Sequence, residues 1–328
     1  MLQFGQVNPC AGSLVRFAPD PSRDYSVFMS TKWTENCDPA TPAHEFARSV
    51  LSERTNVMES LLPLAAHHHR DDTEHVHQLR VSSRRSAAAL RAFTPLMSKK
   101  PHKLKDWLKR IRAAAGPARD IDVLMDRFAQ ESSPGAVTHY AAERLALERN
   151  EAQLALVEVS KQAIKGKLDR IAERTLRLLS KQRDPRTLGE FGMNAVRLAY
   201  TPFARLMHAQ DSTIEELHEL RIAGKRLRYS LEIFHGLFPA DLREKIYPLV
   251  EDLQGRLGEI NDHATAQVLF QSWLGAMPAD DLAAQIAQRV VTEREDAERM
   301  SLAFLRWWNP TRIAKVEAFF NKCCPISE

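Results

Sequence analysis

The sequence predicts an all-α protein, and three observations lead to this fold class. From residue 42 onward, apolar residues recur every three or four positions, which is the period of a helix with one buried face. No segment of useful length alternates apolar and polar residues as a half-buried strand does. Apolar residues make up 44% of the 328 positions, which is enough to fill the cores of two helical bundles.

The first helices are expected after a tail. Residues 1–40 show no helical period and contain four prolines and two glycines, so we expect them to be disordered. Thr41 is the predicted N-cap of a first helix, which carries Phe46 and Val50 on its apolar side. A second helix is expected over about 72–95.

A turn is predicted within the next part of the chain. A basic helix carries Leu104 and Trp107 on its apolar side, and the GPARD segment at 116–120 indicates a turn after it. A short helix should then run to Phe128, and Pro134 should open a long helix.

The polar segment KQRDPR at 181–186 is the predicted boundary between two halves of one domain over residues 41–325. The first half is expected at about 41–180 and the second at about 187–325, with the same order of helices. The predicted helices of the second half cover residues 189–208, 213–237, 241–257 and 262–275, followed by a long helix after Pro278 and a short one after Pro310.

An internal repeat is the most informative feature of the chain. Residues 76–93 read VHQLRVSSRRSAAALRAF, and residues 217–234 read LHELRIAGKRLRYSLEIF. A constant offset of 141 positions keeps histidine, leucine, arginine and phenylalanine in register. Two unrelated solvent faces have no reason to share such a register, so the repeat indicates a shared function.

Each copy of the repeat gathers its cations on one helix face. On a helix advancing about 100° per residue, the four cations of the second copy lie within roughly 80° of one another. The first stripe comprises His77, Arg80, Arg84 and Arg91, and the second stripe comprises His218, Arg221, Lys225 and Arg228. Arg85 and Arg226 flank the two stripes. Leucines and a phenylalanine form the opposite, apolar side, so the charged side is free to bind an anion.

A glycine- and aspartate-containing segment follows each copy. It reads AAGPARDIDVL at 114–124 and RLGEINDHATA at 256–266. We expect Asp120 and Asp262 to follow a turn and either to cap the next helix or to pair with an arginine of a stripe. Metal ligation and acid catalysis by these two carboxylates stay open as alternatives.

These four ordered motifs resemble the CHAD family, the conserved-histidine α-helical domains, over roughly residues 42–320. The resemblance implies two pseudo-symmetric antiparallel helical bundles and a basic groove that binds inorganic polyphosphate. The implied polyphosphate-binding residues are His77, Arg80, Arg84, Arg85, Arg91, Lys105, His218, Arg221, Lys225, Arg226 and Arg228. One departure is visible: the family usually has arginine ten residues after the first histidine, and this chain has Ala87.

The positive charge is concentrated in one region. The formal net charge is only +4, yet residues 80–119 hold twelve Lys or Arg and a single acid, Asp106. The remainder of the chain is therefore net acidic. Such a concentration indicates a localised site for a polyanion rather than a uniformly basic surface.

Other interpretations of the same residues stay open. An arginine face is often a solvated surface paired with acids, and the two motif histidines could be core residues bonded to carbonyls. A nucleic-acid backbone could bind the same cations, although Tyr229 is the one aromatic residue suitably placed in the motifs. A phosphoryl-transfer or metal-binding protein would need carboxylates beside His77 or His218.

Enzymatic signatures are absent from the sequence. It contains no GxxxxGK[ST], GxGxxG, HExxH or GxSxG segment. The run HHHRDDTEHVH at 67–77 combines imidazoles and carboxylates, but without a recognised ligand spacing. We therefore expect no catalytic residue, no metal site and no cofactor.

The four cysteines and the apolar runs bear on location. The cysteines lie near the termini without CxxC spacing, which fits a reduced cytoplasm. No apolar run approaches the roughly 20 residues that span a bilayer, and no export signal is evident. We expect a cytoplasmic protein without membrane contact whose partner is inorganic polyphosphate, with polyphosphate granules or polyphosphate-metabolising enzymes as further possibilities.

Overall fold

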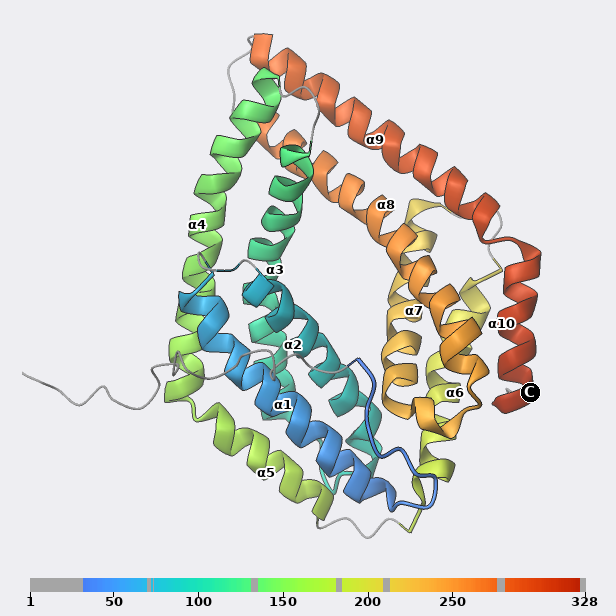
Figure 1. The fold of residues 1–328 in the computed structure, drawn as a ribbon. Coiled ribbons are helices and arrows are strands. Elements are labelled where there is room, and N and C mark those ends of the chain that lie inside the picture. The colour runs from blue at the N-terminus through green and yellow to red at the C-terminus, as the bar shows by residue number, and fades with distance from the viewer. Residues whose placement is uncertain are drawn as a thin grey trace, which may run out of the picture.

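The computed structural model describes residues 32–69, 72, 74–130, 135–180, 185–208, 213–275 and 281–324 (Figure 1). Within these ranges the chain is helical apart from short connections, and the only strand-like pairing is an isolated bridge between Pro42 and Thr187. The predicted all-α fold class is therefore confirmed.

The helices follow the same order on both sides of residue 187. The first half comprises α1 (Ala43–His67), α2 (Glu74–Phe93), the 3-10 turn η2 (Thr94–Leu96), α3 (His102–Ala129), α4 (Ala136–Lys165) and α5 (Leu168–Ser180). The second half comprises α6 (Leu188–Leu206), α7 (Ile214–Phe234), η3 (His235–Leu237), the π-helical η4 (Leu242–Ile246), α8 (Tyr247–Leu274), α9 (Asp281–Trp307) and α10 (Pro310–Cys323). The stripe-bearing helices α2 and α7 have 20 and 21 residues, and α3 and α8 have 28 residues each.

The predicted turns at the two aspartates were wrong. Helix α3 continues through Gly116 and Pro117, and α8 runs unbroken across the gap that was expected between 257 and 262. The alanines around Gly116 favour helix strongly enough to offset the two breakers, and three of them are buried. Asp120 and Asp262 therefore lie inside helices, so neither caps one.

Two further helix ends differ from the expectation. Lys167, in the left-handed region at φ 55°, separates α4 from α5, which had been expected as one long helix. Thr41 is not the cap of α1, because the N-cap position is Pro42 and no side chain caps it. Capping boxes instead begin α6, at Thr187 and Glu190, and α7, where Thr213 and Glu216 occupy the same positions.

Residues 32–40 were placed in the disordered tail, and the structure corrects this. Lys32 pairs with Glu251 of α8 at 2.7 Å, and the backbone N–H of Thr34 donates to the Glu232 carbonyl of α7 at 3.2 Å. The Trp33 ring lies 4.5 Å from that of Tyr247. This segment lacks helical period because it packs as an irregular strap across α7 and α8. Residues 1–31 lie outside the described part of the chain.

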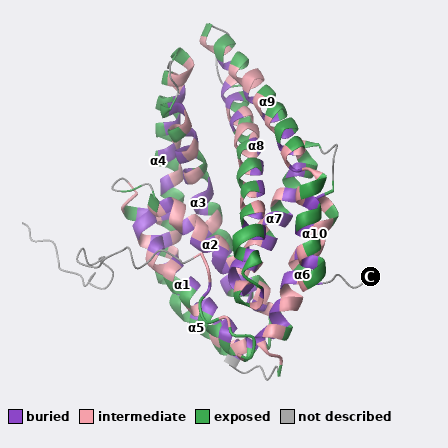
Figure 2. Ribbon diagram, turned by 45° about the vertical axis from the view of Figure 1, so that its right-hand side comes forward, coloured by how far each residue is buried: buried purple, intermediate pink, exposed green. Residues whose placement is uncertain are grey.

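Four phenylalanines join the two halves in the main hydrophobic core. Phe46 of α1 and Phe93 of α2 meet Phe191 of α6 and Phe234 of α7, with ring centroids 5.7 to 6.3 Å apart. All four side chains are buried, and each contributes about 1.5–3 kcal/mol by leaving water. Figure 2 shows buried residues on the helices of both halves.

A second, smaller core joins the far ends of the longest helices. Phe128 at the end of α3 lies 5.8 Å from Phe270 of α8, and Ile286 of α9 is buried in the same cluster. The ribbon in Figure 1 shows α3 and α4 converging there with α8 and α9. The halves therefore contact each other at two places, and the N-terminal parts of α2 and α7 lie between them.

Candidate functional site

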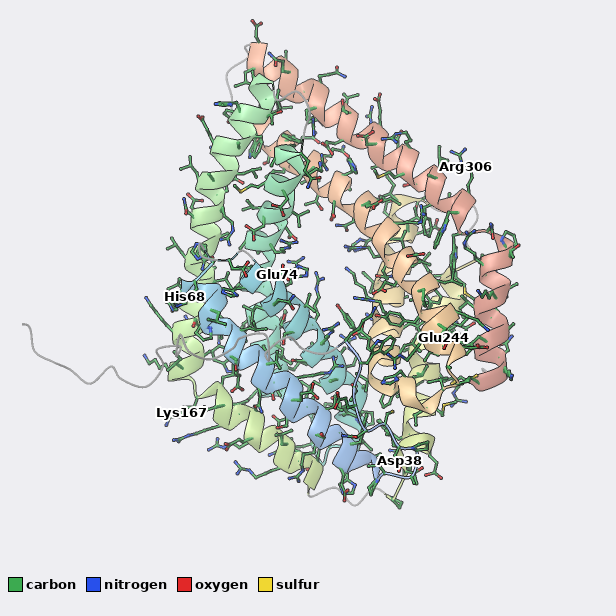
Figure 3. All side chains as sticks on the ribbon, in the orientation of Figure 1. Asp38, His68, Glu74, Lys167, Glu244 and Arg306 are labelled. Atoms are coloured by element: carbon green, nitrogen blue, oxygen red, sulfur yellow. The ribbon has the colours of Figure 1, made fainter. Side chains whose placement is uncertain are left out.

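Helices α2 and α7 contact each other with equivalent residues of the two repeat copies facing. Phe93 and Phe234, which are 141 positions apart, lie with ring centroids 5.7 Å apart. Further toward the helix starts, Arg80 and Arg221 are related by the same offset. Arg221 lowers the pKa of Arg80, and Arg84 of α2 lowers the pKa of Arg221. Figure 3 shows side chains of α2 and α3 on one side, and of α7 and α8 on the other, projecting into the space between the halves.

The central part of this surface consists of cations from both stripes. Burial lowers the pKa of Arg80, and Arg84 and Arg221 lower it further. Burial also lowers the pKa of Arg221, which Arg84 lowers as well. Like charges on two helices are thus held close enough to destabilise one another. A cluster of like charges of this kind favours an anion as its partner.

Lys225 is at the centre of this cluster. Burial lowers the pKa of Lys225 to about 7, and four arginines lower it in the same direction. These arginines are Arg80, Arg84, Arg221 and Arg228. This pKa places the titration of the ammonium group near neutral pH. The sequence does not reveal this property, because the arginines come from two distant segments.

The two aspartates lie beside the cluster. The Arg80 guanidinium pairs with the Asp120 carboxylate at 3.0 Å, so the predicted pairing with a stripe arginine is confirmed for this residue. A Cβ at position 116 would lie 3.0 Å from Arg80 Nη1, so Gly116 gives that side chain room. Burial raises the pKa of Asp262, while Arg221 lowers it. The aspartates thus offset part of the positive charge.

Arg85 does not belong to the exposed cationic surface. Its Nε donates to Glu232 of α7 at 3.1 Å, and Glu232 is fully buried. Glu232 also accepts from the Tyr247 hydroxyl at 2.8 Å. Burial lowers the pKa of Arg54, to about 10, and nearby Glu232 raises it. Arg85 therefore joins the halves, and we remove it from the candidate ligands.

Arg228 is partly neutralised by acids of its own half. Its Nη1 lies 3.4 Å from Glu232 and 3.6 Å from Glu251, and it donates to the Tyr247 hydroxyl at 3.5 Å. Burial alone would lower the pKa of Arg228, but Glu232, Tyr229 and Tyr247 together raise it by more, so the pKa is raised. The guanidinium also lies 5.0 Å from the Tyr229 ring, as a bracing contact requires. Arg228 is the least available cation of the second stripe.

The two motif histidines differ in their surroundings. His77 is half-buried, and its pKa is lowered first by burial and also by Arg119, Arg84 and Arg80, against a raising effect of Glu74. His218 is exposed near the start of α7. Neither is a core histidine bonded to a carbonyl in any contact that the structure gives.

The remaining predicted cations lie further along the helices. Arg91 and Arg226 both reach solvent. Partial desolvation of the Arg91 guanidinium lowers its pKa, and Arg226 of α7 lowers it further. Lys105 is exposed on α3 and lines a pocket together with Arg91. The stripe surface therefore continues from Lys225 past Arg91 toward the start of α3.

One pair of a histidine and a carboxylate was not predicted from the sequence. His263 Nδ1 lies 2.7 Å from buried Glu293, which also pairs with Arg127 and Arg289. These residues stabilise the far contact between α3, α8 and α9. Within the described ranges no group of three metal-ligating side chains gathers at one point. The histidine run at 67–77 falls partly outside those ranges.

The family comparison agrees with the motifs. The sequence model of the CHAD domain matches residues 40–271, and the chain belongs to this family. A search of curated proteins finds no match. No described helix combines the length and apolar character needed to cross a membrane.

Two solved structures share the fold. The crystal structure of the CHAD domain from the plant Ricinus communis has a TM-score of 0.64 at 22% identity, covering 87% of this chain and 93% of that chain. PptA from Streptomyces chartreusis has a TM-score of 0.54 at 18% identity, covering 82% of this chain and 99% of that chain. At these identities the likeness supports the helical architecture and not a shared ligand.

Proposed function

We propose that this protein binds inorganic polyphosphate between the two stripes without chemical turnover. The observation that carries the proposal is Lys225, a cation half-buried among four arginines from α2 and α7. Holding these charges together costs free energy in the absence of a ligand, and a chain of phosphates would offset that cost. Some CHAD family members bind polyphosphate, which supports the same conclusion.

The chemistry of the ligand suits the surface. Polyphosphate is a flexible chain of negative charges without bases, so it needs rows of cations and no stacking platforms. Arg84 and Arg221 offer fork-shaped donors to phosphate oxygens, and Lys225 offers an adaptable point charge. Tyr229, the aromatic residue that could have stacked on a base, is 7% exposed. The surface therefore favours polyphosphate over single-stranded nucleic acid.

A competition titration tests this proposal. Labelled long-chain polyphosphate is bound to the purified protein, and unlabelled polyphosphate, single-stranded DNA, heparin and ATP compete at equal charge concentration. We expect polyphosphate to compete best and its affinity to fall steeply with salt. Orthophosphate release is followed in parallel. Stronger competition by DNA, or steady release of phosphate, would contradict the proposal.

The cellular source of the ligand follows from its chemistry. The ligand would be free polyphosphate in the cytoplasm or polyphosphate in granules, and an enzyme of polyphosphate metabolism could share the bound chain. We propose a binding protein rather than a transferase, because among the described residues no cluster of three metal-ligating side chains gathers near His77 to support phosphoryl transfer.

A further inference from the structure

The two halves differ at one pair of equivalent positions. Ala87 of α2 corresponds to Arg228 of α7, at the offset of 141. The helices packed on them are related by an offset of 142, which matches Asp120 with Asp262. By that offset Lys105 and Lys109 of α3 correspond to Tyr247 and Glu251 of α8, and Arg112 corresponds to Gln254.

In the second half this space is filled and neutral. The Arg228 side chain reaches α8, where it contacts the Tyr247 hydroxyl at 3.5 Å and Glu251 at 3.6 Å. A residue with a Cβ at position 224 would collide with Gln254, so the two helices are closely packed there. The charge of Arg228 is therefore neutralised by its acidic partners without a ligand.

In the first half the equivalent space is open and cationic. A pocket of about 420 Å³ lies beside Ala87, and its lining residues come from α2, α3 and the connection between them. Its charged lining consists of Arg91, Lys100, Lys105, Lys109 and Arg112, with His102 beside them. Lys105, Lys109 and Arg112 follow one another at spacings of four and three, so they share one face of α3.

The pocket has no counter-charge among the described residues. None of Lys105, Lys109 and Arg112 has a carboxylate within ion-pair distance there, in contrast to the Arg228 site. The volume lies within the range of pockets that hold small ligands. A cavity lined by unpaired cations on one helix face is suited to phosphate oxygens.

The pocket is continuous with the stripes. Arg91 belongs both to the first stripe and to the pocket lining, and it faces Arg226 of α7 and Arg112 of α3. A second pocket of about 540 Å³ shares Lys100 and His102 with the first. It adds Lys103 of α3 and Arg174 of α5. In these two pockets, positive charge thus extends from the stripes across the first half.

We propose that the pocket beside Ala87 is a phosphate-binding site that takes the continuation of the chain held between the stripes. This inference rests on the proposed function. Because position 87 carries alanine, this space is open to a ligand. In the second half the Arg228 side chain fills the equivalent space. A long chain then binds asymmetrically, with its extension over α3 and α5 and none over α8.

The first test removes the charge of the pocket. The variant Lys105→Gln, Lys109→Gln, Arg112→Gln is compared with a matched control on α9, Arg294→Gln, Arg299→Gln, Arg306→Gln, which loses the same charge from exposed positions. Calorimetry measures binding of long-chain polyphosphate, tripolyphosphate and ATP. We expect the pocket variant to lose on the order of tenfold in affinity for the long chain, and its salt slope to fall by about two, for three lost contacts. Tripolyphosphate, which the stripes hold alone, should change no more than in the control.

The second test fills the pocket without altering charge. Ala87→Met should weaken long-chain binding several-fold, because the larger side chain occupies the space that Arg228 occupies in the other half. Ala113→Met, at an exposed position of α3 outside the pocket lining, is the control. Thermal melting of each variant establishes that the fold is retained.

The outcomes separate this inference from the proposed function. If the wild type binds the long chain and both pocket variants match their controls, the pocket is not part of the path, while the proposed function stands. If the pocket variants lose ATP or tripolyphosphate but keep the long chain, the pocket is a separate site for compact phosphates and the continuity is refuted. If the wild type does not bind long-chain polyphosphate, the proposed function itself fails.

Discussion

Arg85 of α2 and Glu232 of α7 form an ion pair at 3.1 Å across the contact between the two halves, and Glu232 has no exposed surface. The adjacent residue in sequence, Arg84, belongs to the cationic cluster around Lys225. Two neighbouring arginines thus have opposite roles: one holds the halves together, and the other is available to a ligand. The same contact places the four phenylalanines behind the stripes.

Replacing Glu232 with glutamine should destabilise the protein strongly. The change leaves Arg85 and Arg228 without their buried carboxylate, and removing one partner of a buried pair costs about 3–5 kcal/mol. Urea unfolding followed by circular dichroism measures the loss. Asp241→Asn, which breaks the exposed pair with Lys245, is the control and should leave the midpoint nearly unchanged. Equal effects of the two changes would contradict a structural role for Glu232.

Arg84 and Arg85 should separate binding from stability. Arg84→Gln should weaken polyphosphate binding by roughly tenfold at low salt and leave stability unchanged or raised, because like charges are relieved. Arg85→Gln should lower stability by about 3 kcal/mol, and the folded fraction should bind normally. Calorimetric titration and urea unfolding of both variants give the comparison. If Arg85→Gln loses affinity while it stays folded, the removal of Arg85 from the ligand set is wrong.

Polyphosphate binding should take up a proton near neutral pH. The pKa of Lys225 is lowered to about 7 in the free protein, and a bound polyanion favours the charged ammonium. The proton is therefore taken up mainly at and above pH 7, and affinity rises as pH falls from about 9 toward 7. The charged groups around Lys225 are Arg80 and Arg84 of α2, Arg221 and Arg228 of α7, and Asp262 of α8.

The variant Lys225→Arg should abolish most of that pH dependence, since arginine keeps its charge throughout this range. Calorimetry in buffers of different ionisation enthalpy counts the protons directly. His77→Gln is the comparison, because burial lowers the pKa of His77 and moves its titration toward more acidic pH. A proton uptake that persists in Lys225→Arg and disappears in His77→Gln would assign the linkage to the histidine.

The same lysine should make stability depend on pH. Its folded pKa lies below its unfolded value, so the unfolded chain binds more protons between about pH 7 and 10, and stability rises with pH across that window. Lys225→Met should remove this contribution and stabilise the protein by roughly 1–2 kcal/mol at pH 7, after allowance for solvent screening. Urea unfolding at several pH values tests it. An unchanged slope in the variant would show that Lys225 is not desolvated.

The all-α class and most helices could be predicted because each depends on local periodicity. Asp120 shows where this fails: the glycine and proline before it indicate a turn, yet Gly116 lies within a helix and makes space for Arg80. Residues 32–40 carry no helical pattern because they pack as an irregular strap, which a periodicity search cannot detect.

The site was predictable as a set of cations but not as an arrangement. The repeat identified Arg84 and Lys225, since both keep the register, and it also included Arg85, which has the same residue type but lies on the buried side. Glu232, its partner 147 positions away, could not be located from the sequence. Ala87 was recognised as a departure from the family pattern, and its consequence, an open cationic pocket, required the geometry of α3.

The central claim is that cations from both stripes together bind polyphosphate, and one titration tests it most directly. The variant Arg84→Glu, Arg221→Glu, Lys225→Glu is compared with Arg294→Glu, Arg299→Glu, Arg306→Glu, which carries the same change in net charge on α9. Anisotropy of labelled long-chain polyphosphate is measured at moderate salt, with helicity checked by circular dichroism. We predict that binding is lost in the stripe variant and changes only a few-fold in the α9 variant. Equal affinity of the two folded variants would contradict the claim.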